Sequence, residues 1–193
     1  MNGKGTTNVL FAGVGGQGIV LASSLLATVC LAAGHDVKQS EVHGMAQRGG
    51  SVTSHVRFGP TVHSPTIAQG EADYLVAFEL LEAARWLGCL AADGTALVNT
   101  QRIEPITVTS GATEYPSDLE DRIREGCAHP VLIDAFGQAQ QAGSVRAVNM
   151  VLLGSLATRL GFGEEVWHRA ISERVPSRTF TINWKAFGAG RQL

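Results

Sequence analysis

Short runs of mainly apolar residues alternate along the chain with longer stretches of mixed polarity. The short runs have strand length and the composition of parallel strands buried on both faces; they occupy residues 8–12, 73–78, 94–99 and 130–135. The longer stretches predict helices at residues 19–33, 79–90, 145–160 and 164–174. Strands that alternate with helices predict an α/β fold, here a Rossmann-like, mostly parallel sheet with helices on both faces.

Residues 51–58 have a different pattern, with strict alternation of side-chain type. The two sets are Val52, Ser54, Val56 and Phe58 on one side and Thr53, His55 and Arg57 on the other. Such alternation predicts a strand with one face toward the core and the other toward water or a partner. Gly59-Pro60 signals a turn, and residues 61–65 are expected to return as a short antiparallel partner. This predicts an antiparallel hairpin insertion near residues 52–67.

The remaining segments complete a single domain over residues 1–193. Residues 35–40 are expected to form the second strand, and residues 101–114 are irregular. Ser117-Asp-Leu-Glu120 has the spacing of a capping box and predicts a helix that continues through Arg124. The last residues, 179–193, predict a short helix with Trp184 and Phe187, and we expect the tail from about 176 to 193 to serve as a docking surface.

Composition narrows the class of protein. The chain has 193 residues, of which 45% are hydrophobic and 17% charged, and this excludes a disordered or coiled-coil protein. The net charge of -2 gives no basic footprint for a nucleic acid. The longest apolar run, 19–33, is interrupted by polar residues and is short for a membrane span. No segment resembles a signal peptide, so we expect a cytoplasmic protein without membrane contact.

The cysteines offer no cofactor site. Cys30, Cys89 and Cys127 are far apart in the sequence and form no C-x-x-C pair. We therefore expect no iron–sulfur cluster, zinc site or disulfide framework built by this chain alone. The histidines form no H-E-x-x-H motif, and both a G-x-S-x-G elbow and a Walker A motif are absent.

A glycine-rich segment between the first predicted strand and helix is the first candidate binding site. It reads Gly13-Val-Gly15-Gly16-Gln17-Gly18, which fits the G-x-G-x-x-G dinucleotide fingerprint in the required context. Glycines let a backbone approach a phosphate, and a helix N-terminus supplies N–H groups. The fingerprint also needs an acidic residue at the end of the second strand, and Glu41 lies close to that position in the sequence. The alternative is a tight turn with close helix packing and no nucleotide.

The second candidate is the polar, glycine-punctuated segment 41–51. Long loops at strand ends carry function in α/β domains. His43 can exchange protons near neutral pH, and Arg48 can clamp a carboxylate or phosphate. The candidate ligand-binding residues here are His43, Gln47, Arg48, Gly49 and Ser51. The alternative is a structural loop whose side chains satisfy its own backbone.

Three segments together resemble a known family. They are Phe11-Ala-Gly-Val-Gly-Gly-Gln-Gly-Ile-Val-Leu-Ala22, the segment 40–51, and the tail Ile182-Asn-Trp-Lys-Ala-Phe-Gly-Ala-Gly190. The chain is similar over essentially its whole length to the gamma domain of 2-oxoacid:ferredoxin oxidoreductases, and most to the indolepyruvate type. The pair of N-terminal motifs is specific, whereas either motif alone is not.

The resemblance implies a division of labour between subunits. Enzymes of this family oxidatively decarboxylate a 2-oxo acid with coenzyme A and pass the electrons to ferredoxin. It implies that a large partner subunit holds thiamine diphosphate, Mg²⁺ and the iron–sulfur clusters, while this chain is non-catalytic. This chain then helps to enclose the coenzyme A side of a shared site and contacts ferredoxin only through the partner. We expect the isolated chain to be inactive and able to form a homodimer.

Two other functions compete with this hypothesis. One is a free-standing Rossmann oxidoreductase that binds NAD or FAD; the unusual segment 41–51 and the lack of a separate substrate domain count against it. The other is a regulatory or assembly module that binds a nucleotide and catalyses nothing.

Overall fold

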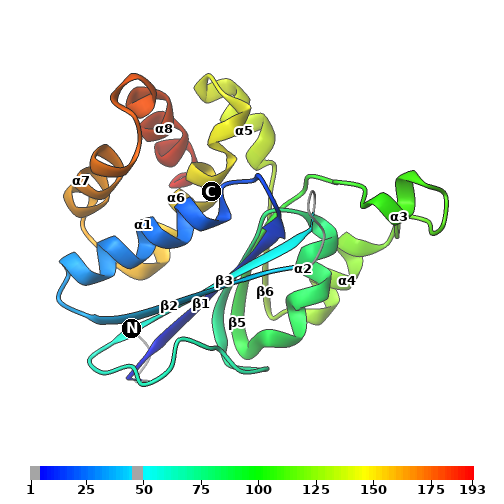
Figure 1. The fold of residues 1–193 in the computed structure, drawn as a ribbon, viewed down its shortest axis with the longest axis horizontal. Helices are drawn as coiled ribbons and strands as arrows, with labels where there is room; N and C mark the ends of the chain where they lie inside the picture. Colours follow the sequence, from blue (N-terminus) through cyan, green and yellow to red (C-terminus); the bar gives the residue numbers. More distant parts are fainter. Residues whose placement is uncertain (1–4, 45–49) are drawn as a thin grey trace.

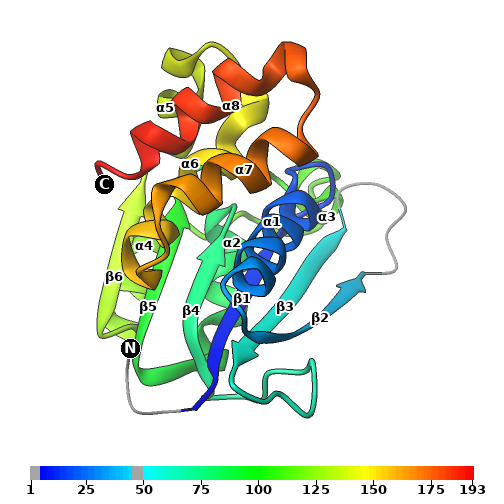
Figure 2. The same cartoon turned by 90° about the vertical axis from the view of Figure 1, so that its left-hand side faces the viewer.

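A six-stranded sheet between two layers of helices forms the protein (Figures 1 and 2). The structure is a computed structural model that describes residues 5–44 and 50–193. The strands are β1 (Thr7–Val14), β2 (Asp36–His43), β3 (Ser51–Gly59), β4 (Ala72–Ala77), β5 (Leu90–Asn99) and β6 (His129–Ile133). Their order is β2-β3-β1-β4-β5-β6. The pairs β1–β4, β4–β5 and β5–β6 are parallel, so the predicted α/β fold with a mostly parallel sheet is confirmed.

The helices cover both faces of this sheet, as predicted. They are α1 (Ile19–Ala32), α2 (Leu80–Trp86), α3 (Ile106–Thr109), α4 (Leu119–Gly126), α5 (Ala135–Ala142), α6 (Val148–Leu160), α7 (Glu164–Arg174) and α8 (Ser177–Gly190), with 3₁₀ turns at Leu87–Cys89 and Val145–Ala147. Successive side chains of a strand point to opposite faces of the sheet and contribute to two separate hydrophobic cores. Phe11 and Leu97 face the core under α1 and α5–α8, whereas Leu10 and Val98 face α2 and α4.

The antiparallel insertion has a different partner from the predicted one. Residues 61–65 do not return as a strand; instead β3 pairs antiparallel with both β2 and β1. Side chains hold residues 61–67 as a coil. Arg57 donates to the carbonyl oxygens of Ser64 and Thr66 at 3.1 and 3.0 Å, and the Asp36 carboxylate accepts from the Val62 N–H at 2.8 Å. Pro65 has no N–H for a strand ladder, which weakens the predicted pairing further.

The alternation in β3 predicts its two faces correctly but misassigns the environment of one. Val52, Val56 and Phe58 face the core beneath α1. The opposite face is covered as well, because the side chains of Thr53 and His55 are buried. The Ile67 N–H donates to His55 Nδ1 at 3.2 Å, and burial, reinforced by the nearby Arg57 charge, lowers the pKa of His55. The prediction that one face of this strand meets water or a partner is therefore wrong.

Three local predictions also differ from the structure. Helix α5 lies where none was predicted, between β6 and α6. Helix α2 ends at Trp86, and β5 already begins at Leu90. The Ser117–Glu120 capping box does not form: the N-cap of α4 is Asp118, which makes no side-chain cap bond, and the Glu120 carboxylate accepts from Arg124 at 3.0 Å.

The predicted C-terminal helix exists and is longer than expected. Helix α8 packs on α6, with Ala186, Phe187 and Gly190 buried between them. Trp184 is only partly buried and stacks on Phe187, with ring centroids 5.2 Å apart. The apolar residues of the tail therefore belong largely to the core. Within the part of the chain that the structure describes, no helix combines the length and apolarity that crossing a membrane requires.

Candidate functional site

The glycine-rich loop lies at the carboxyl end of β1 and leads into α1 (Figure 2). Gly16 and Gly18 adopt φ angles of +96° and +81°, a conformation that side chains disfavour. Gly18 is the N-cap of α1, whose first turn contains no acidic residue. The positive end of the helix dipole is thus open to an anionic ligand, as the sequence motif predicts.

Gln17 braces this loop from within. Its Oε1 accepts from the Val14 N–H at 2.7 Å, and its Nε2 donates to the Phe78 carbonyl oxygen at 2.9 Å. A Cβ on Gly13 would lie 2.7 Å from both Gln17 Oε1 and Phe78 Cβ, so only glycine fits there. Gln17 was predicted to bind a cofactor, but both ends of its amide are engaged by the protein, which makes it a support of the loop.

The ends of segment 41–51 lie beside the glycine loop, where the sequence places them. The Gly15 N–H donates to the Gly50 carbonyl oxygen at 3.0 Å, and the Gly44 N–H donates to the Ser51 oxygen at 2.7 Å. His43 ends β2 opposite Val52 of β3. The predicted ligand-binding residues Gln47, Arg48 and Gly49 lie outside the described residues.

Ser51 is held by a buried carboxylate. Its hydroxyl donates to Glu82 Oε2 at 2.5 Å, and Arg85 donates to Glu82 Oε1 at 2.6 Å. Glu82 is only 4% exposed, on the first turn of α2. Sequence reasoning missed this glutamate, because a charged residue near a helix start ordinarily faces solvent. Ser51 thus fixes the start of β3 against α2.

Two hollows flank the glycine loop. The first has a volume of about 620 Å³ and lies between the loop, the start of α1, the end of β2, the start of β3 and the end of α7. Its lining comprises Gly15, Gly16, Gly18, Ile19, Val20, Leu21, Ser24, His43, Val52 and Arg174. His43 is therefore placed at a site with room for a ligand. Arg174 was not predicted; it is the basic residue in the last turn of α7, a position that does not by itself signal binding.

The second hollow has a volume of about 440 Å³ and lies on the opposite flank of the loop. It is lined by Gly16, Gln17, Gly18, Leu21, Gln101, Ile103, Phe136, Val145, Arg146, Val148 and Asn149. Gly16, Gly18 and Leu21 border both hollows, so the loop is the wall between them. Asn149 Nδ2 donates to the Gly18 carbonyl oxygen at 3.3 Å and ties α6 to this wall.

A chain of side-chain amides fixes the carboxyl edge of the sheet. The Phe78 carbonyl oxygen accepts from Asn99 Nδ2 at 3.0 Å in addition to Gln17. Asn99 Oδ1 in turn accepts from the Ala135 N–H at 3.1 Å, where α5 begins. The chain runs from β1 through β4 and β5 to α5, which holds the walls of the second hollow in one arrangement.

Glu79 anchors the irregular segment that follows β5. This carboxylate is 1% exposed and accepts from the Ile103 N–H at 3.2 Å and from the Tyr115 hydroxyl. Burial, together with this hydrogen bond to Glu79, raises the pKa of Tyr115. Both ends of the segment are therefore tied to the N-cap residue of α2, and Ile103 is held at the rim of the second hollow.

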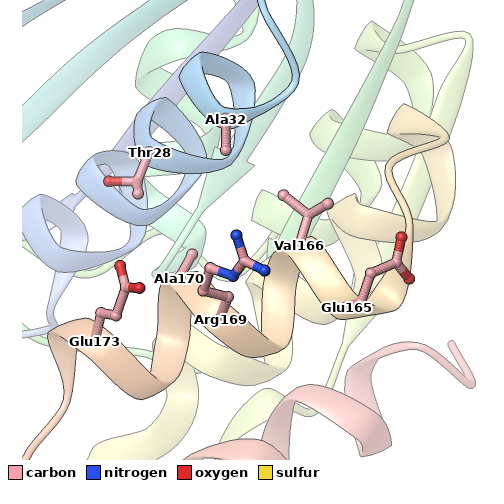
Figure 3. A pocket seen from close by; sticks show the side chains of 7 residues that line it. All are labelled: Thr28, Ala32, Glu165, Val166, Arg169, Ala170 and Glu173. Carbon is pink, nitrogen blue, oxygen red and sulfur yellow. The ribbon is translucent and has the colours of Figure 1, made fainter.

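A third, smaller pocket of about 140 Å³ lies between α1 and α7 (Figure 3). Its lining is Thr28, Ala32, Glu165, Val166, Arg169, Ala170 and Glu173. None of these residues borders either hollow at the glycine loop. We therefore place the candidate site at the two larger hollows.

The geometry counts against the NAD-binding alternative. The Gly15 N–H already donates to Gly50, and the Gln17 N–H donates to the Val14 carbonyl at 3.3 Å, which leaves the N–H groups at the start of α1 for an anion. Glu41 is exposed on β2, which is the edge strand and is separated from β1 by β3. In the dinucleotide fold the acid follows a strand adjacent to β1. The glycine motif is present, but its dinucleotide context is not.

Comparisons with known proteins agree with this geometry. Residues 8–193 match the protein family described as pyruvate ferredoxin/flavodoxin oxidoreductase. Indolepyruvate oxidoreductase subunit IorB of Thermococcus kodakarensis is 37% identical over 188 residues, which cover 95% of this chain and 93% of the relative.

Two solved structures share the fold. A keto/oxoacid ferredoxin oxidoreductase gamma subunit from Geobacter sulfurreducens matches with a TM-score of 0.72 and 23% identity, covering 96% of each chain. A 2-oxoglutarate:ferredoxin oxidoreductase from Magnetococcus marinus, solved with 2-oxoglutarate, coenzyme A and succinyl-CoA bound, matches with a TM-score of 0.75 and 22% identity. That match covers 98% of this chain and 31% of the other, so the same fold forms about a third of a longer polypeptide there.

Proposed function

We propose, from the premise that this chain belongs to the pyruvate ferredoxin/flavodoxin oxidoreductase family, that it is the small, non-catalytic subunit of a 2-oxoacid:ferredoxin oxidoreductase. Its task is to close the coenzyme A side of an active site shared with a larger partner. The substrate that we propose first is indolepyruvate or another aryl pyruvate, because a relative with 37% identity is an indolepyruvate oxidoreductase subunit.

The first hollow is the observation that carries this proposal. Its lining joins the N-terminus of α1 to His43 and Arg174, and none of the described residues in it is acidic. A Cβ on Gly15 would meet its nearest atom at 3.8 Å, and one on Gly16 would meet nothing within 4 Å, so the loop leaves open space. The phosphates of coenzyme A fit such a surface, since a helix N-terminus and a guanidinium both favour anions. Arg48 of the neighbouring segment stays a sequence prediction for the same role.

Coenzyme A supplies the thiol that takes up the acyl group. The residues of this chain bind and orient the cofactor, and they exclude water from one side of the cleft. Their chemistry does not fit the other cofactors of the reaction. Cys30, Cys89 and Cys127 are all buried in the core, and the described residues include no cluster of three His, Cys, Asp or Glu that could hold a metal. We therefore assign thiamine diphosphate, Mg²⁺, the iron–sulfur clusters and ferredoxin contact to the larger partner.

The partner should dock on the carboxyl edge of the sheet. In the described part of the chain, three large apolar side chains are exposed at this edge outside the second hollow: Val20, Val42 and Ile106. Covering such a group of apolar side chains with a partner removes them from water and stabilises the complex. In the isolated chain the same edge offers a surface for a homodimer.

Reconstitution with the large subunit tests the proposal. The pair should reduce a viologen with indolepyruvate and coenzyme A, and this chain alone should not. In the reconstituted enzyme, Arg174→Ala should raise the KM for coenzyme A about tenfold, because a charge-assisted hydrogen bond contributes about 1.5–3 kcal/mol.

Arg169→Ala is the matched control, since Arg169 lies on the same helix and lines the separate pocket of Figure 3. It should leave the KM unchanged. Turnover by the isolated chain, or equal effects of the two arginine substitutions, would contradict the proposed role.

A further inference from the structure

The two hollows beside the glycine loop differ in chemistry. The first contains the cationic or protonatable side chains of Arg174 and His43. The second is lined by three carboxamides and several apolar side chains, and Arg146 is the one charged residue among the described residues that line it. A phosphate group suits the first set. The second set suits a flat, uncharged group with both donors and acceptors on its edge.

The walls of the second hollow are set before any ligand arrives. Asn149 is 3% exposed; its Oδ1 accepts from the Met150 N–H at 3.0 Å while its Nδ2 donates to Gly18. Gln101 Oε1 accepts from Asn99 Nδ2 at 3.3 Å, which orients the amide so that its NH₂ group can donate to a ligand. A site whose groups are already oriented loses little conformational entropy on binding.

The rim of this hollow exposes apolar surface. Phe136 at the start of α5 is 39% exposed, and Val145 before α6 is 43% exposed. An aromatic ring at the mouth of a cavity offers a stacking face for a planar heterocycle. With about 440 Å³, the hollow has the volume of a nucleoside-sized ligand site.

The two hollows can accommodate one ligand. Gly16 and Gly18 border both of them, and neither glycine has a side chain that would block the passage over the loop. We propose that the second hollow is a purine subsite, an assignment that rests on the proposed function. The adenine base of coenzyme A lies against Phe136 and Val145, and its phosphates lie over the start of α1 beside Arg174. The subsite contributes binding free energy only and takes no part in a covalent step.

The reconstituted enzyme tests this subsite with two acyl acceptors. Coenzyme A carries the adenine nucleotide, whereas pantetheine has the same reacting thiol without it. Phe136→Ala should raise the KM for coenzyme A about tenfold with an unchanged kcat, since stacking on an aromatic side chain contributes about 1–3 kcal/mol per base. The same variant should leave turnover with pantetheine unchanged.

A second variant and a control separate binding from folding. Val145→Trp narrows the hollow from its rim and should also raise only the KM for coenzyme A. Leu31→Ala removes an exposed apolar side chain from the last turn of α1, away from both hollows, and should change neither acceptor.

Two results would overturn the purine subsite. One is an unchanged KM for coenzyme A in both rim variants. The other is an equal loss with coenzyme A and pantetheine. Either result leaves the Arg174→Ala effect intact if the chain encloses coenzyme A at the first hollow. Failure of the proposed function is recognised differently, by the absence of any Arg174→Ala effect.

Discussion

The glycine loop and the contact between α6 and α8 are both built around glycine, but the two regions use it in opposite ways. Between the helices, a Cβ on Gly154 would overlap the Phe187 carbonyl oxygen, and one on Gly190 would overlap the Val151 carbonyl oxygen. At the loop, a Cβ on Gly15 would meet nothing closer than 3.8 Å. In the first region the missing side chain lets two backbones touch. In the second it leaves space that the chain itself does not fill.

This difference changes how the C-terminal segment is interpreted. Its likeness to the family includes Ala186, Phe187 and Gly190, and these are the residues buried between α8 and α6. Helix packing therefore accounts for that part of the motif. A docking role for the tail stays a prediction, and it falls on the outer side chains of α8, such as the partly exposed Trp184.

The largest expected effect is on stability, from Gly190→Ala. The new methyl group would collide with backbone atoms of Val151, which no side-chain rotation can relieve. We expect a loss of about 2 kcal/mol or more in the free energy of unfolding, because overpacking outweighs the gain in helix propensity. The melting temperature should fall by about 4–8 °C for a chain of this size.

Gly188→Ala is the matched control in the same helix. A Cβ on Gly188 would have nothing within 4 Å, so this substitution should be neutral or stabilise the protein by up to about 1 kcal/mol. Thermal unfolding of both variants measures the difference. Equal melting temperatures would show that the α6–α8 contact tolerates a side chain, so that these glycines would not differ from those of the loop.

The second effect is expected at Gly18, where backbone conformation and contact act together. Gly18→Ala places a side chain at φ +81° and 2.6 Å from Asn149 Nδ2. We expect a loss of about 2 kcal/mol in stability, of which the left-handed conformation accounts for about half. Gly34→Ala isolates that half, because Gly34 has φ +85° and open space around it. If both variants lose the same stability in urea unfolding, Asn149 does not constrain the loop.

The sequence predicts the mostly parallel sheet, most of its helices and the neighbouring positions of the two candidate segments. Their apolar runs and glycine signals are local, so periodicity detects them. It fails where a side chain of another segment decides the conformation: Arg57 of β3 holds residues 61–67 out of the sheet. The second hollow was missed for the same reason. Gln101, Phe136 and Asn149 come from three separate segments, and nothing in their local pattern indicates that they meet.

A third, smaller effect tests whether Gln17 supports the loop, as its contacts indicate. Gln17→Leu keeps the approximate volume but removes the acceptor for the Val14 N–H and one donor to Phe78. We expect a loss of about 1 kcal/mol, since the buried donor is left unpaired. Gln140→Leu, at an exposed position on α5, is the control and should be neutral in the same unfolding experiment. If Gln17→Leu leaves the stability unchanged, Gln17 does not support the loop, and it becomes a candidate for ligand binding again.

The smallest expected effect on stability comes from Gly15→Ala, and it is the most informative about the loop. Gly15 is exposed, its φ is not in the left-handed region, and the new methyl group would meet Gly50 O at 3.8 Å and Val52 Cγ2 at 3.9 Å, which are ordinary contacts. The melting temperature should therefore stay within about 1–2 °C of the unsubstituted protein, in line with surface substitutions that cost under about 0.5 kcal/mol.

The methyl group of Gly15→Ala nevertheless projects where the proposed phosphates approach the backbone. The KM for coenzyme A in the reconstituted enzyme should rise about tenfold, which corresponds to about 1.4 kcal/mol of lost binding. A variant with unchanged stability and an unchanged KM would mean that the open space at Gly15 serves no ligand, and the contrast with the α6–α8 glycines would then reduce to a difference in packing alone.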